Sequence, residues 1–178
     1  AASTIADKIK NWKYIAIDYE GGQNPIEATF PPVVLSKFSR SQAVRYLKLL
    51  KENEHLVAPH DRNLMVGTHI NVSSGSTPQF DSNRVTDMLG VLWGLANSYD
   101  IRTRTAVTFC DTYFGRRPYG SCYNQGGYIE YKLFNSTTDV KVLKKYVAVA
   151  VALTKMIEGD MPITRNSVMG YVRANVSI

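Results

Sequence analysis

The chain has 178 residues, of which 44% are hydrophobic and 20% are charged; this balance excludes intrinsic disorder for most of its length and suits a single folded domain. No apolar run approaches the roughly 20 residues that a transmembrane helix requires. The net charge of +6 favours a nucleotide, a nucleic acid or an acidic protein surface as a partner, but it fits a solvated basic surface equally well.

The first half of the chain carries alternating strand and helix patterns. Two segments rich in β-branched and aromatic residues flank a Gly-Gly-Gln-Asn-Pro turn signal, and Pro31-Pro32 ends the second of them. The predicted elements are, in order, a helix over 3–10, strands over 13–20 and 26–30, a helix from Ser39 or Ser41 to about 53, and a strand over 64–73.

The second half is richer in helix. Apolar residues between 85 and 93 follow the spacing of one helix face, after a candidate N-cap at Asp81 or Ser82. The break Gly159-Asp160-Met161-Pro162 separates two further helices. The predicted elements are a helix from 82, a strand over 104–108, a hairpin or loop over 111–126, a strand over 128–134, a helix over 139–158 and a short C-terminal helix.

The strand over 128–134 alternates apolar and polar residues, the period of a half-buried strand. The pattern places two sets of side chains on opposite faces: Ile129, Tyr131 and Leu133 against Glu130, Lys132 and Phe134.

Paired strands between single helices favour an α+β fold, with a largely antiparallel sheet and helices packed on one face. A doubly wound parallel sheet fits less well, because it needs a helix at each crossover. We expect one domain over residues 1–178.

Polar residues interrupt four of the predicted strands, in three segments of the chain. If these strands lie in one sheet, their carboxylates, histidine and basic residues can converge on the open face and hold Mg²⁺ and a polyphosphate. An antiparallel sheet with one wet face shows polar residues at alternate positions anyway, and spacing alone favours that simpler interpretation. The residues are Asp18, Glu20 and Glu27 in the first two strands, His69, Asn71 and Ser73 in the third, and Glu130 and Lys132 in the last.

Taken in order, these segments resemble the amidoligases, a family of glutamine-synthetase-like carboxylate–amine ligases that bacteriophages often encode. The resemblance covers roughly residues 14–158 and leaves 159–178 as a C-terminal extension. The segments that carry it are Asp18, Ile26-Glu27-Ala28-Thr29-Phe30-Pro31-Pro32, Gly67-Thr68-His69-Ile70-Asn71-Val72, and Gly127-Tyr128-Ile129-Glu130-Tyr131-Lys132-Leu133-Phe134-Asn135-Ser136-Thr137.

The resemblance implies a glutamine-synthetase-like fold and ATP- and Mg²⁺-dependent amide formation through an acyl phosphate. Metal and basic side chains would stabilise charge on the transferred phosphoryl group. The implied roles are catalytic for Glu27, His69 and Glu130, metal-binding for Asp18, Glu20, Glu27 and Glu130, and nucleotide-binding for Lys132. Four arginines are candidate nucleotide-binding residues on their charge and position alone: Arg102, Arg104, Arg116 and Arg117.

The chain departs from the family pattern at several places. Asn71 replaces the second histidine of the paired motif, and Lys132 replaces an arginine, whose planar two-pronged contact a lysine cannot make. The family's first Gly-x-Glu-x-Glu strand is missing. Asp18-Tyr19-Glu20 is a possible substitute, but it sits where the family's later aspartate belongs. The chain also opens at Ala1 without an initiator methionine, which indicates a processed or excised piece.

These departures favour a non-catalytic structural or assembly module that binds other protein subunits, as a processed component of a phage virion. The alternative is a working ligase completed by another segment or chain. A third hypothesis, a basic nucleic-acid-contacting domain, rests on the net charge and the arginines between 102 and 117.

We expect a virion or host-cytoplasm location if a phage encodes the chain, a cytoplasmic one otherwise, and no membrane partner. Whether Cys110 and Cys122 form a disulfide stays open.

Overall fold

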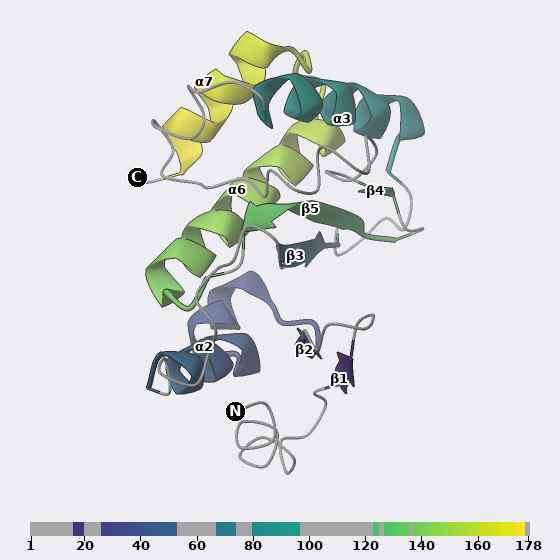
Figure 1. The fold of residues 1–178 in the computed structure, drawn as a ribbon. Coiled ribbons are helices and arrows are strands. Elements are labelled where there is room, and N and C mark those ends of the chain that lie inside the picture. Colours follow the sequence, from purple (N-terminus) through teal and green to yellow (C-terminus); the bar gives the residue numbers. More distant parts are fainter. Residues whose placement is uncertain are drawn as a thin grey trace. The chain divides into compact units, whose positions relative to one another are not determined.

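Both strands and helices occur along the computed structural model, which describes residues 16–19, 26–52, 67–73, 80–96, 123–124, 127–135 and 137–176. All strand pairs among them are antiparallel, so the fold is α+β (Figure 1). The elements are β1 (Ala16–Tyr19), β2 (Ile26–Thr29), η1 (Leu35–Arg40), α2 (Gln42–Glu52), β3 (Gly67–Val72), α3 (Ser82–Ala96), β4 (Tyr123–Asn124), β5 (Ile129–Asn135), α6 (Val140–Glu158) and α7 (Arg165–Asn175).

The helices predicted near 42, 82, 140 and after 162 are confirmed, as are the strands within 13–20, 26–30, 64–73 and 128–134. The described strands form two sheets, β1–β2 and β3–β5–β4, where the sequence analysis expects one. The predicted helix over 3–10 and strand over 104–108 lie outside the described residues. None of the helices in the described ranges is long and apolar enough to cross a membrane.

The chain divides into two compact units: residues 1–64 with 137–140, and residues 65–136 with 141–178. The first contains β1, β2, η1 and α2. The Ser41 hydroxyl accepts a 3.4 Å hydrogen bond from the Val44 amide at the start of α2, which is the role predicted for it. Val44 and Leu47 are buried on one face of this helix.

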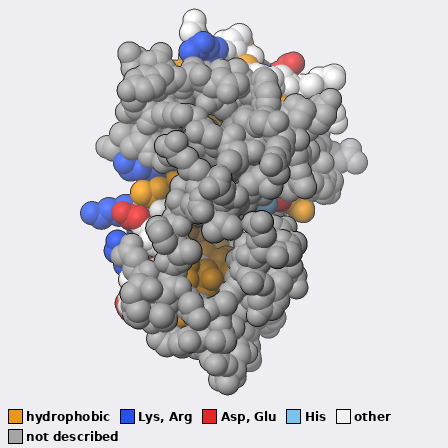
Figure 2. All heavy atoms as spheres, in the orientation of Figure 1, with side chains coloured by type: hydrophobic (Ala, Val, Ile, Leu, Met, Phe, Trp, Pro, Cys, Tyr) orange, Lys and Arg blue, Asp and Glu red, His pale blue; other side chains and the backbone are white. Residues whose placement is uncertain are grey.

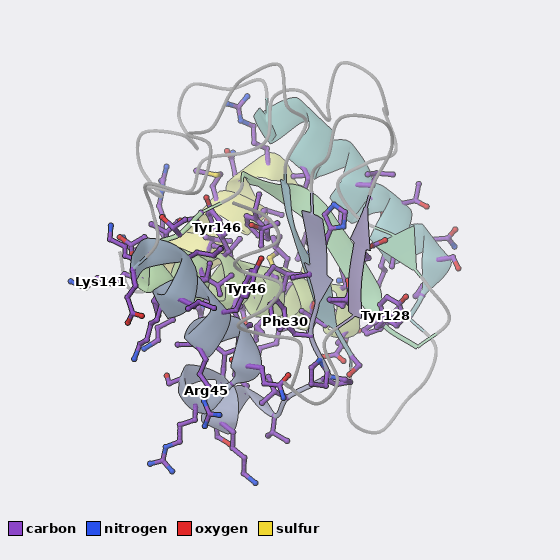
Figure 3. The ribbon with its side chains drawn as sticks, turned by 60° about the horizontal axis from the view of Figure 1, so that its bottom comes forward. Phe30, Arg45, Tyr46, Tyr128, Lys141 and Tyr146 are labelled. Atoms are coloured by element: carbon purple, nitrogen blue, oxygen red, sulfur yellow. The ribbon has the colours of Figure 1, made fainter. Side chains whose placement is uncertain are left out.

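An aromatic contact joins α2 to the end of β2. Figure 3 shows the Tyr46 and Phe30 side chains close together, and their ring centroids are 5.4 Å apart in a tilted arrangement. Burial raises the pKa of the Tyr46 phenol above its ordinary value of 10.0. Tyr46 is therefore part of the small apolar core of the first unit.

In the second unit, the pairing of the central strand β5 with β3 contains a register shift. Ile70 lies opposite Tyr131, but Thr68 lies opposite Phe134. One residue of β3 therefore faces two residues of β5, which is the geometry of a β-bulge.

The bulge places Tyr131 and Phe134 on the same face of the sheet, although they are three positions apart. Ile129, Tyr131 and Phe134 are all fully buried. The prediction that Phe134 lies on the same face as Glu130 is wrong, because the extra residue of the bulge shifts the alternation by one position.

Helix α6 covers this apolar face. The Phe134 ring stacks on Tyr146 with centroids 4.6 Å apart, and the Tyr131 hydroxyl forms a 2.8 Å hydrogen bond with the Thr154 hydroxyl. Thr154 also donates to the Ala150 carbonyl at 2.9 Å, so this buried hydroxyl is satisfied. The second unit therefore has its core between β5 and α6.

The C-terminal end of α6 is held by a side chain from α3. The Arg84 guanidinium donates to the carbonyls of Ile157 at 2.8 Å, Met156 at 2.7 Å and Met161 at 2.8 Å. The last carbonyls of a helix have no partner within it, and a cation there also complements the helix dipole. Arg84 thus ties α3, the end of α6 and the turn toward α7 together.

We predict that Arg84→Met lowers the free energy of unfolding by about 2–3 kcal/mol, because it removes three charge-assisted hydrogen bonds and leaves half-buried carbonyls unsatisfied. Urea unfolding followed by circular dichroism measures the change. Arg165→Met on the exposed start of α7 is the matched control and should change stability by less than about 0.5 kcal/mol. Equal effects of the two variants would contradict this role of Arg84.

Candidate functional site

The face of β3 and β5 opposite α6 carries polar residues. His69 and Asn71 alternate with Ile70 on β3, and Asn71 lies directly opposite Glu130. The prediction that His69 and Asn71 share one face is confirmed; Ser73 follows the end of the strand and is exposed.

The closest approach on this face joins the imidazole and the carboxylate. His69 Nδ1 lies 3.6 Å from Glu130 Oε1, and the two side chains are 25% and 15% exposed. This distance exceeds that of a good hydrogen bond, so the contact is chiefly electrostatic and is an ion pair when the imidazole is protonated. Partial burial reduces solvent screening and strengthens it relative to a surface pair.

The bulge determines which residues of β5 lie opposite His69. The two β5 residues opposite it are Lys132 and Leu133, whose side chains fall outside the described part of the structure. The phosphate-binding role predicted for Lys132 is placed by register only, next to His69 and two positions from Glu130.

The β1–β2 hairpin brings two of the predicted metal ligands together. Asp18 lies directly opposite Glu27 in the antiparallel register. Directly opposed residues of such a pair share one face with Cβ atoms about 5 Å apart. The backbone therefore pairs these two acidic positions, and their side chains are not described.

The other predicted site residues lie outside the described residues: Glu20, Arg102, Arg104, Arg116 and Arg117, together with Cys110 and Cys122. Among the side chains that the structure describes, no group of three or more His, Cys, Asp or Glu is arranged to hold a metal ion. Asp18 and Glu27 belong to the first unit, whereas His69 and Glu130 belong to the second. Convergence of all three strand segments on one site stays a prediction, as does nucleic-acid contact through the arginines.

Sequence reasoning missed one exposed apolar run. Val33, Val34 and Leu35 are 41%, 67% and 54% exposed, directly after Pro31-Pro32. The signal was present: three aliphatic residues lie between a strand terminator and a helix cap, in a segment with neither helical nor strand periodicity.

Comparison with family models, curated proteins and solved structures finds no match to this chain. The resemblance to the amidoligases therefore rests on the strand motifs alone.

We predict that His69 and Glu130 are energetically coupled in a pH-dependent way. A double-mutant cycle of His69→Gln, Glu130→Gln and the double variant should give a larger coupling near pH 5.5 than near pH 8.5, because the contact is an ion pair only when the imidazole carries a proton. Urea unfolding at both pH values measures the coupling. The same coupling at the two pH values would contradict an electrostatic contact.

Proposed function

We propose that this chain is a non-catalytic, amidoligase-like module with a glutamine-synthetase-like fold, and that it works by assembling with other protein subunits as part of a bacteriophage virion. The α+β composition and the antiparallel pairing of the strands are compatible with that fold. The location follows from the proposal: the virion, or the host cytoplasm before assembly.

The contact between His69 and Glu130 is the observation that carries the proposal. In the ligase chemistry, Glu130 would give its carboxylate oxygens to Mg²⁺, because hard cations take anionic oxygen ligands. When the imidazole carries a proton, it lies 3.6 Å from the same oxygen, competes with a cation for it and offsets its negative charge. Such a pair stabilises two strands of the sheet and weakens the attraction for a cation.

Two departures from the family pattern also favour a non-catalytic module. Asn71, opposite Glu130, offers a neutral amide where the pattern has a second histidine. Lys132 offers a point charge where an arginine would clamp phosphate with two parallel hydrogen bonds. Both changes remove groups that ligation chemistry needs, while leaving the polar face intact.

A working ligase is the second candidate, and the register of Asp18 and Glu27 favours it. Like charges directly opposite each other destabilise a strand pair unless something compensates them. A bound divalent cation would provide that compensation, and two carboxylates are ligands of the kind that Mg²⁺ accepts.

We predict that calorimetric titration of the full chain with Mg²⁺ and a non-hydrolysable ATP analogue gives no binding heat, in the wild type or in Glu130→Gln. Glu27→Gln should raise the midpoint of thermal unfolding by a few degrees, with or without Mg²⁺, because it removes a like-charge pair from the β1–β2 hairpin.

The ligase predicts the opposite pattern. The wild type would bind the nucleotide with micromolar affinity, both Glu130→Gln and Glu27→Gln would abolish the heat, and Glu27→Gln would lower the unfolding midpoint in Mg²⁺. That pattern would overturn the non-catalytic proposal and justify a screen of carboxylate and amine substrates.

A further inference from the structure

The apolar run Val33-Val34-Leu35 is unusual for the surface of this chain. The large hydrophobic side chains that are exposed among the described residues are these three and Tyr128, so three of the four are consecutive. Val34 has an extended backbone at φ −63° and ψ 135°. The run therefore presents adjacent bulky aliphatic side chains to solvent in the first unit.

Basic residues follow the run closely. Between 36 and 52 the sequence has five basic residues and a single acidic one, Glu52. All five basic side chains are exposed, and they are Lys37, Arg40, Arg45, Lys48 and Lys51.

Helix α2 is amphipathic, and its basic side chains lie on the exposed face. Val44 and Leu47 are buried, while Arg45 and Lys48, one turn apart, are exposed. Figure 3 shows Arg45 on α2, with the next residue, Tyr46, in contact with Phe30. Figure 2 shows basic, acidic and hydrophobic side chains next to one another at one margin of the view. The segment 33–51 thus combines an exposed apolar run with a basic helix face.

We propose that segment 33–51 docks on the surface of a bilayer that contains anionic phospholipids. Exposed aliphatic residues can enter the boundary between headgroups and acyl chains, while lysine and arginine bind the lipid phosphates and keep their charges in water. The lack of an apolar run long enough to span a bilayer predicts no membrane partner, but docking at the surface needs no spanning helix.

The residue types favour a lipid surface over the other anionic partners. Hot spots of protein interfaces are enriched in Trp, Tyr and Arg and poor in Val and Leu, the residues that form this run. Nucleic-acid surfaces use basic residues with aromatic stacking, and exposed valines add nothing to phosphate contacts. The proposal is independent of whether the chain is an assembly module or a ligase.

Cosedimentation of the full chain with phospholipid vesicles tests the proposal. The wild type should bind vesicles containing about one-third phosphatidylserine and not vesicles of phosphatidylcholine alone, with affinity that falls as salt rises. Two variants should each weaken binding about tenfold or more: Arg45→Glu with Lys48→Glu, and Val33→Ser with Val34→Ser and Leu35→Ser.

The matched control is Lys144→Glu with Arg165→Glu, which makes the same change in net charge at exposed positions of α6 and α7. It should keep the wild-type affinity within about twofold, because it leaves segment 33–51 unchanged. Three results would overturn the proposal: no binding of the wild type to phosphatidylserine vesicles, equal weakening in the control, or full binding by the serine variant. A serine variant that binds vesicles and duplex DNA as well as the wild type does would indicate a general polyanion surface instead.

Discussion

Stacking of Phe134 on Tyr146 and the hydrogen bond between Tyr131 and Thr154 both form because β5 carries one extra residue between its two aromatic anchors. Without the bulge, residues 131 and 134 would point to opposite faces of the strand. One aromatic ring would then leave the core beneath α6, at a cost of several kcal/mol. The same extra residue sets which β5 positions stand opposite His69.

The bulge therefore determines which residues of β5 lie on the buried face and which lie on the polar face. The face toward α6 is buried, and its Tyr131 hydroxyl is hydrogen-bonded to Thr154 of α6, whose hydroxyl also donates to the Ala150 carbonyl. The opposite face is half-exposed and carries His69 beside Glu130. A carboxylate that faces a protonated imidazole attracts a cation less strongly, which is why we propose assembly rather than catalysis.

Helical periodicity made most of this fold predictable, because an apolar helix face can be recognised in the sequence without knowing the surface on which it packs. The starts of α2 and α3 follow from their caps: Ser41 accepts from the Val44 amide and Asp81 from the Asn83 amide. The bulge was not predictable, since one extra residue leaves no mark on a short alternating strand. For the same reason sequence alone placed Phe134 on the wrong face. The Arg84 contacts, more than 70 positions apart in sequence, also have no local signal.

The most direct test of the account is a nitrogen-15 NMR spectrum of the His69 imidazole in the full chain, assigned with His69→Gln. The account predicts that the ring resonances move in Glu130→Gln and do not move when Mg²⁺ and a non-hydrolysable ATP analogue are added. Ring resonances that move on addition of Mg²⁺ and nucleotide, and stop doing so in Glu130→Gln, would contradict it and make this face a nucleotide site.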